Sequence, residues 1–378
     1  MPPVAVRILH PEAGPDAGPL TRRLAEARSR IADRHRRGFM AVGASDVQIV
    51  SGRPDERSFG DRLRGQVDPG GGPCGLVVLG SGAIPLATAA DRRAFVATAS
   101  GDDRTALANN RFSADVVAIA RVETLPAIPD LPGDNALPRW LEEVAGYRVD
   151  DLRRRWRLSF DLDGPLDLVL LGETLGGGGR EGAVSDSTVA DRLAAVRAIA
   201  TDRRAELLLA GRTSASTLGW LEHHAAARVR AWVEERGLRA ASRLAQASDP
   251  AADPRLGGTS GLAPSAGRAP TSILGLLLDR DGPGSLGTHL ARFADAAIVD
   301  TRVLLAHRLG ADETGWPPAE DRFASDLLLA EAVADPWLRV LTASAAAASI
   351  PILLGGHTLV GPGVRLVVAG PPRRTRWR

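Results

Sequence analysis

The fold is decided by one stretch, Pro73 to Val96, which reads PCGLVVLGSGAIPLATAADRRAFV. Residues 75–79 are apolar and rich in Val and Leu, and a run this short is typical of a buried strand. The Gly-Ser-Gly of residues 80–82 ends the strand in a tight loop, and Thr88 or Asp91 could cap the helix that follows. Open α/β sheets place ligands at such loops, although an ordinary βα turn has the same pattern.

Strands and helices alternate on both sides of this stretch. Val4 to Leu9 and Val47 to Val50 are predicted strands around a helix at Leu20 to Arg37, and this βαβ unit predicts a parallel sheet. The rest of the first half predicts a strand at 115–120, a helix from 134 to 146 and a strand at 155–167 that carries Asp161, Asp163 and Asp167. The second half predicts strands at 206–210, 229–233, 273–278, 296–299 and 350–354.

The length and the glycine pattern predict two domains. A chain of 378 residues exceeds what one hydrophobic core usually supports. Gly176 to Gly179 form the strongest flexible segment, and residues 245–270 predict a loose loop. We therefore expect an α/β protein with two Rossmann-like domains, each a mostly parallel sheet flanked by helices. The domains are predicted at residues 1–172 and 188–378, with a Gly-rich linker at 173–187.

The composition restricts the chemistry. Hydrophobic residues make up 44% and charged residues 24%, which is typical of globular proteins, and no apolar run has the length of a membrane span. We expect a cytoplasmic protein without a membrane partner. The single cysteine, Cys74, excludes an intrachain disulfide and a thiolate metal cluster. All 47 basic residues are arginines, which excludes Schiff-base chemistry, a Walker-A lysine and a lysine general base.

The charge balance does not indicate nucleic-acid binding. The formal net charge is only +2, and the sequence pI near 9.4 follows from arginines that do not titrate below it. Arg153 to Arg157 and the tail from Pro372 to Arg378 are basic clusters that could touch phosphates, but solvated charge runs are the commoner case. We do not expect a nucleic-acid partner. A homo-oligomer is compatible with the sequence and not required by it.

One motif resembles a known family. The order of a helix ending at Gly146, a short link and DLDGPLDL at residues 161–168 resembles the D-x-D-x-P-x-D-L motif of the nucleotidyltransferase-type α/β fold, which includes the molybdenum-cofactor and phospholactate guanylyltransferases. GAIPL at residues 82–86 resembles the family's D-x-P-L strand end. The resemblance covers residues 1–170 and implies that Asp161 and Asp163 bind Mg²⁺. The family's other metal-binding aspartate corresponds here to Ala83, and its Gly-rich opening loop is absent.

A second group of residues indicates an anion site in the second half. GRTSAST at residues 211–217 places Arg212, Thr213 and Ser214 at the start of a helix, where N–H groups and the helix dipole favour an anion. N-capping of the helix accounts for only one of the hydroxyl groups in this stretch. The carboxyl ends of parallel strands converge on one crevice, so polar residues that end the other strands are candidates for the same site. These are Glu234, Glu235, Asp300, Arg302, Gly355, Gly356 and His357.

We assign expected roles within this group. Glu234, Asp300 and His357 are the catalytic candidates, because carboxylates and histidine perform acid–base work. Arg212, Thr213, Ser214, Arg302, Gly355 and Gly356 are the phosphate- or substrate-binding candidates. The alternative is that Glu234 with Arg236, and Asp300 with Arg302, form structural ion pairs.

The leading hypothesis is an enzyme of the nucleotidyltransferase type that binds a nucleotide or another small phosphorylated ligand with Mg²⁺. In this hypothesis the second domain supplies part of the substrate site. Two alternatives remain open: a non-catalytic ligand-binding or scaffold protein with a degenerate nucleotidyltransferase fold, and a phosphohydrolase centred in the second domain.

Overall fold

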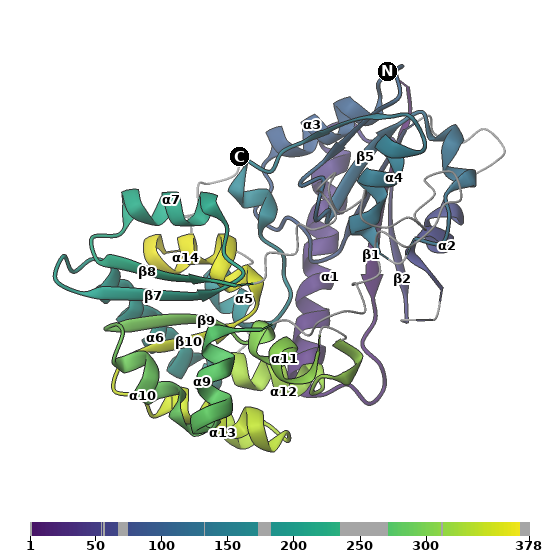
Figure 1. The fold of residues 1–378 in the computed structure, drawn as a ribbon. Coiled ribbons are helices and arrows are strands. Elements are labelled where there is room, and N and C mark those ends of the chain that lie inside the picture. The colour runs from purple at the N-terminus through teal and green to yellow at the C-terminus, as the bar shows by residue number, and fades with distance from the viewer. Residues whose placement is uncertain are drawn as a thin grey trace, which may run out of the picture. The chain divides into compact units, whose positions relative to one another are not determined.

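The computed structural model describes residues 2–53, 55, 57–66, 75–131, 133–172, 183–234, 271–310 and 313–370. These residues fall into two compact units (Figure 1). Unit 1 comprises those within Met1–Pro15 and Ala25–Leu162, and unit 2 comprises those within Asp16–Leu24, Asp163–Arg236 and Gly267–Arg378. Each unit contains a sheet and helices, so the predicted α/β class is confirmed. Cys74, Glu235, the glycines at 176–179, the loop at 245–270 and the C-terminal tail lie outside the described residues.

Unit 1 has a mixed sheet of six strands in the order β2-β1-β3-β5-β4-β6. In that order the strands are Asp46–Gly52, Val4–Pro11, Gly75–Gly80, Val116–Ala120, Thr105–Ala108 and Arg148–Asp151. β1 is parallel to β2 and β3, and β4 is parallel to β6, whereas β5 is antiparallel to both of its neighbours. The sequence pattern does not predict β4 and β6, because strands of four residues show too little alternation.

The remaining elements of unit 1 are helices, and they show that one predicted strand is wrong. Its α-helices are α1 (Pro19–Met40), α2 (Phe59–Arg64), α3 (Ala89–Ala99) and α4 (Leu137–Glu143), and its 3₁₀ helices are η1 (Val122–Ala127), η2 (Asp134–Ala136) and η3 (Trp156–Ser159). The strand predicted at 155–167 is wrong, because η3 and the start of α5 (Pro165–Leu171) occupy that range. Pro165 at the first helical position and Asp167 two residues later favour a helix start.

The central stretch of the sequence forms β3, a buried loop and α3. Thr88 caps α3 reciprocally: its hydroxyl accepts from the N–H of Asp91 at 3.2 Å, and the Asp91 carboxylate accepts from the N–H of Thr88 at 2.8 Å. All residues from Ser81 to Ala87 are buried. His35 of α1 holds the loop, since its Nε2–H donates to the carbonyl oxygen of Ala83 at 2.8 Å. The loop is therefore part of the interior of unit 1.

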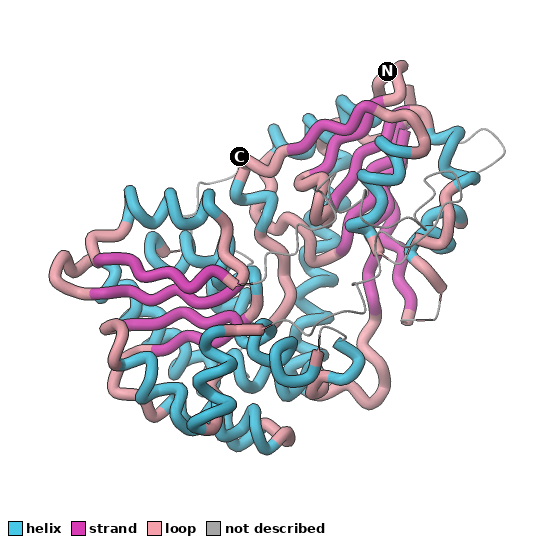
Figure 2. Tube along the Cα trace, in the orientation of Figure 1, coloured by secondary structure: helices cyan, strands magenta, loops and turns pink. Residues whose placement is uncertain are grey.

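Unit 2 has a parallel sheet of four strands in the order β10-β9-β7-β8, which run side by side in Figure 2. In that order the strands are Ile352–Gly355, Ala296–Asp300, Glu206–Gly211 and Arg228–Val233. The α-helices besides α5 are α6 (Ala183–Ala200), α7 (Ala215–His224), α9 (Ile273–Asp281), α10 (Leu286–Ala291), α11 (Thr301–Leu309), α12 (Ala319–Asp326), α13 (Pro336–Ala346) and α14 (Val364–Ala369). Single turns are η9 (Pro283–Ser285), η10 (Glu313–Gly315), η11 (Ala330–Ala332) and the π-helical η12 (Leu359–Gly363).

The strand predicted at 273–278 is also wrong, because these residues begin helix α9. Ser272 caps the helix by accepting from the N–H of Gly275 at 3.1 Å. Leu274 and Leu278 are buried four residues apart, whereas Ile273 and Leu276 are exposed, and this spacing is helical. A short apolar run alone does not distinguish the two structures.

The strand order of unit 2 determines where a ligand would bind. From β7 the chain goes first to β8 on one side and later to β9 on the other side. The order therefore reverses between β7 and β9. In open parallel sheets the loops at the carboxyl ends of the strands separate at such a switch point and leave a crevice.

Candidate functional site

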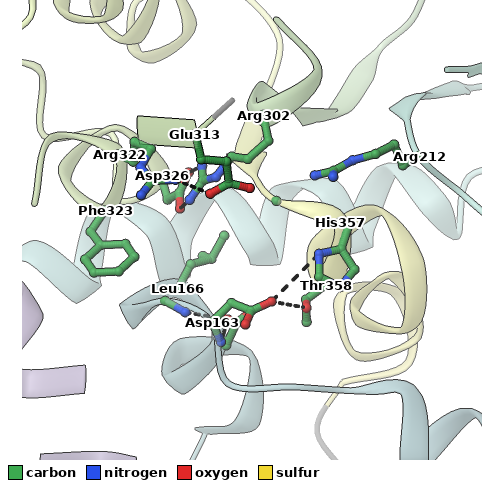
Figure 3. A pocket seen from close by; sticks show the side chains of 13 residues that line it. Asp163, Leu166, Arg212, Arg302, Glu313, Arg322, Phe323, Asp326, His357 and Thr358 are labelled. Atoms are coloured by element: carbon green, nitrogen blue, oxygen red, sulfur yellow. Dashed lines mark hydrogen bonds and ion pairs between the residues drawn. The ribbon is translucent and has the colours of Figure 1, made fainter. Parts of the chain in front are cut away.

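A pocket of about 320 Å³ lies within unit 2 (Figure 3). The segments that follow β7, β9 and β10 contribute Arg212, Arg302, Gly356, His357 and Thr358. The start of α5 contributes Asp163, Gly164, Leu166 and Asp167. The segment from η10 to α12 contributes Glu313, Arg322, Phe323 and Asp326. The pocket thus includes the carboxyl ends of the two strands that flank the switch point.

Arg212 is held at the pocket by Asp300. The Nε and Nη2 of Arg212 donate to Asp300 Oδ2 and Oδ1 at 2.7 and 3.2 Å. Asp300 is buried and also caps α11 by accepting from the N–H of Arg302. The Nη1 of Arg212 has no hydrogen bond to any described residue, and Figure 3 shows the guanidinium pointing into the pocket. Asp300 thus fixes one edge of the guanidinium, and the other edge can bind a ligand.

Gly211 allows this pair to form. Its φ of +140° is one that L side chains rarely adopt, and a Cβ at this position would lie 2.2 Å from the Cβ of Asp300. Only glycine therefore lets β7 end so close to the end of β9.

Arg302 and Asp326 form a buried ion pair in the pocket wall. Arg302 Nη1 and Nη2 donate to Asp326 Oδ1 and Oδ2 at 2.5 and 2.7 Å, and the side chains are 13% and 4% exposed. Burial alone would lower the pKa of Arg302, but the negative charges of Asp326 and Asp300 outweigh it and raise that pKa. Arg302 is therefore a fixed cation whose charge is already balanced.

Asp163, His357 and Thr358 form a polar group on the opposite wall. The Thr358 hydroxyl donates to Asp163 Oδ2 at 3.1 Å, and His357 Nδ1 lies 3.8 Å from the same oxygen. Both His357 and Asp163 are about half exposed. A histidine that lines a pocket beside a carboxylate is a candidate for proton transfer.

Asp167 is a buried carboxyl below this group. Its Oδ2 accepts from the N–H groups of Asp163 and Gly164, each at 2.8 Å. Burial raises the pKa of Asp167 well above its usual value, the negative charge of Asp163 raises it further, and the two N–H groups lower it in part. The folded protein therefore favours a neutral Asp167.

We expect Asp167→Asn to be more stable than the natural protein at pH 7, because asparagine can accept the same N–H groups without the free-energy cost of protonating or ionising a buried carboxyl. Because the raised pKa lowers stability only while the carboxyl is ionised in the unfolded chain, the advantage should shrink as the pH falls to about 4. Urea unfolding at pH 7 and pH 4 measures it. Asp167→Ala, which loses the cap, should instead lose about 1 to 2 kcal/mol. An Asn variant that behaves like the Ala variant would contradict this account.

Two further pocket residues, Arg322 and Glu313, form a charged pair. Arg322 Nη1 donates to Glu313 Oε2 at 3.3 Å, and its guanidinium lies 5.7 Å from the ring centre of Trp316. Sequence reasoning missed Glu313, Arg322, Phe323 and Asp326, as well as the pocket role of α5. The only signal for these residues is the spacing of Arg322 and Asp326, which lie four residues apart on one face of a helix.

The structure brings several predicted site residues together. Arg212, Asp300, Arg302, Gly356 and His357 all lie in or directly behind the pocket. Gly355 ends β10 next to them, and its carbonyl oxygen accepts from the Thr301 hydroxyl at 3.1 Å.

Other predicted residues do not line this pocket. Ser214 caps α7 by accepting from the N–H of Thr217, and Thr213 is fully buried with a hydroxyl that bonds to none of the described residues. Glu234 Oε1 accepts from the Ser272 hydroxyl and the N–H of Ile273, both at 3.0 Å. It therefore holds the start of α9, which explains a buried carboxylate at that place.

The two predicted metal ligands belong to different units. Asp163 is in the pocket of unit 2, whereas Asp161 is in unit 1, where it forms an antiparallel bridge with Ala83. Within the described ranges, no group of three or more His, Cys, Asp or Glu residues is placed to hold a metal ion. Asp163 could thus contribute to a metal site only together with oxygens of a ligand.

Unit 1 has a second polar group at the carboxyl ends of β1 and β3. His10 Nδ1 lies 3.1 Å from the Ser81 hydroxyl. A Cβ on Gly82 would lie 3.1 Å from Arg28 Nε and 3.2 Å from Asp161 Oδ1, so these two side chains enclose the loop. The bridge between Ala83 and Asp161 pairs two of the three positions that the predicted nucleotidyltransferase resemblance marks as metal ligands.

No protein-family model matches the sequence. No curated protein gives a significant match either. Among the helices within the described ranges, none combines the length and apolar character needed to cross a bilayer.

Proposed function

We propose that the pocket of unit 2 binds a small phosphate-bearing ligand, such as a nucleotide. The observation that supports this most strongly is the Arg212–Asp300 pair at the switch point of the sheet. It presents Nη1 to the pocket while the buried carboxylate fixes the plane of the guanidinium. A pre-oriented arginine loses little entropy on binding an oxyanion.

We further propose that Mg²⁺ accompanies the ligand. The pocket carries the carboxylates of Asp163 and Glu313, and these would repel a bare phosphate. Magnesium is commonly held by one or two carboxylates together with phosphate oxygens, which fits a pocket without a preformed cluster. Mg²⁺ would neutralise phosphate charge. We expect it to bind weakly alone and to strengthen ligand binding.

Nucleotidyl transfer is the first reaction that we propose, with the phosphate-bearing ligand of this pocket as the group that accepts the nucleotide. It is supported by the resemblance in residues 1–170. In this proposal His357 moves a proton, with Asp163 beside it. The same pair would equally serve a phosphohydrolase of unit 2, which is the second candidate.

A non-catalytic ligand-binding protein is the third candidate. The observation that favours it is Ala83, which supplies no carboxylate beside Asp161. The candidates differ in one result: Asp163→Asn should abolish any Mg²⁺-dependent turnover of a nucleotide in an enzyme. In a binding protein it should change only affinity.

We expect Arg212→Ala to weaken the binding of a phosphate ligand by about 1.5 to 3 kcal/mol, the usual range for a hydrogen bond to a charged group. Calorimetric titration with inorganic phosphate, AMP and GTP, each with and without Mg²⁺, measures the loss. The matched control is Arg228→Ala, which removes a 72% exposed arginine on β8.

Folding must be checked in the same experiment, because Arg212→Ala leaves the buried Asp300 without its partner. Arg212→Lys keeps a cation there while losing the planar fork, so it should weaken binding with a smaller loss of stability. If the natural protein binds none of the three probes, the proposed function is wrong.

A further inference from the structure

One end of the pocket is apolar. Phe323 from α12 and Leu166 from α5 both line it. The Phe323 ring lies against Gly164, where an added Cβ would meet two ring carbons at 3.4 Å. Both side chains are mostly buried, at 7% and 2% exposure, so their positions are fixed by packing. An apolar ligand group placed here would remove mainly its own apolar surface from water.

The other end carries a cation that is held in place by a carboxylate. Arg302 is bound by Asp326 through both terminal nitrogens. Arg322 is bound by Glu313 through Nη1, and its Nε is buried without a hydrogen bond to any described residue. Arg212 is the pocket arginine whose Nη1 has no bond within the described part of the chain. Figure 3 shows Arg212 and Phe323 on opposite sides of the pocket. A phosphate at Arg212 therefore leaves the apolar end for a different part of the same ligand.

The middle of the pocket limits the number of phosphates. In Figure 3 the carboxylates of Asp163 and Glu313 lie between the two ends. A second and third phosphate that extended from Arg212 would approach these like charges. The volume of about 320 Å³ lies at the lower end of the range that small-molecule sites span. Both the charge and the volume favour one phosphate with one compact substituent.

We propose that the preferred ligand of this pocket is a phosphate monoester with one compact aromatic or apolar group. The phosphate binds Arg212, beside His357, and the apolar group lies against Phe323 and Leu166. This inference rests on the proposed function, since it specifies the ligand class of the same site.

Three probes test this proposal on the natural protein: inorganic phosphate, methyl phosphate and phenyl phosphate. We expect phenyl phosphate to bind about tenfold more tightly than methyl phosphate, because burying about 60 Å² of additional apolar surface changes affinity by that factor. Phe323→Leu keeps an apolar side chain and should reduce the difference to about threefold or less. Arg212→Lys should weaken all three probes by a similar factor.

The outcomes separate the two proposals. If all three probes bind with the same affinity, the monoester inference is wrong and the phosphate site stands. If Phe323→Leu weakens methyl phosphate as much as phenyl phosphate, the residue acts through general stability and the inference is wrong as well. If Arg212→Lys leaves all three affinities unchanged, binding occurs elsewhere and both proposals fail. If none of the three probes binds, both proposals are wrong.

Discussion

Unit 1 should lose about 4 kcal/mol of stability between pH 6.5 and pH 3 because of His35 alone. This side chain is fully buried, and burial, followed by the positive charge of Arg92, lowers the pKa of His35 to about 3. The unfolded chain takes up the proton near pH 6.5, so acid favours unfolding throughout this interval. At about 1.36 kcal/mol for each pKa unit the full effect is about 4.8 kcal/mol, and about 4 kcal/mol of it falls between the two midpoints.

The geometry explains why His35 stays neutral. Its Nε2–H donates to the carbonyl oxygen of Ala83, and its Nδ1 faces the Nη2 of Arg92 at 3.4 Å. Nδ1 must therefore be an acceptor, and a second proton would point at a buried cation. Protonation would therefore place two buried positive charges, His35 and Arg92, next to each other beside the loop at 81–87.

The variant His35→Gln removes the titration while keeping an N–H that can reach Ala83. We expect it to be less stable at pH 7, because it loses ring packing, but to lose about 3 kcal/mol less than the natural protein between pH 7 and pH 4. Hydrogen exchange of α1 and β3 peptides measures unit 1 separately. His223→Gln, an exposed histidine of unit 2, is the control and should leave the acid loss unchanged. Equal acid losses in all three proteins would contradict this role of His35.

The strand ends of unit 2 were predictable because the carboxyl ends of parallel strands lie at the same edge of the sheet. Arg212, Asp300, Arg302 and His357 each follow a strand that the apolar pattern indicates correctly. The strand order was not predictable, and it decides which strand ends line the pocket. Glu234 follows β8, which is the edge strand beyond β7 and away from the switch point. Its carboxylate instead binds the start of α9.

The helical side of the pocket could not be predicted from local sequence. Leu166 and Phe323 have the pattern of ordinary core residues, and only tertiary packing places them at a cavity. The motif at 161–168 resembled a strand end, but the chain begins helix α5 at Pro165. That change puts Asp163 and Asp167 at a helix start, and it explains why Asp167 contributes a cap rather than a strand end.

The second large effect concerns the ion pair in the pocket wall. We expect Arg302→Met to destabilise unit 2 by about 3 to 5 kcal/mol, because it leaves Asp326 buried without its counter-charge. Asp326→Asn should have an effect in the same direction, because it leaves Arg302 buried with less negative charge. Urea unfolding, followed by hydrogen exchange of α11 and α12 peptides, measures both.

The double variant Arg302→Met with Asp326→Leu decides what the pair contributes. Replacing a buried ion pair with apolar residues of similar volume is often close to neutral, so the double variant should lose far less than the sum of the single variants. Inorganic phosphate should still bind it, because Arg212 and Asp300 are unchanged. The bidentate geometry indicates that Asp326 balances the charge of Arg302. If the losses add and phosphate binding also disappears, this interpretation is wrong and Arg302 contacts the ligand directly.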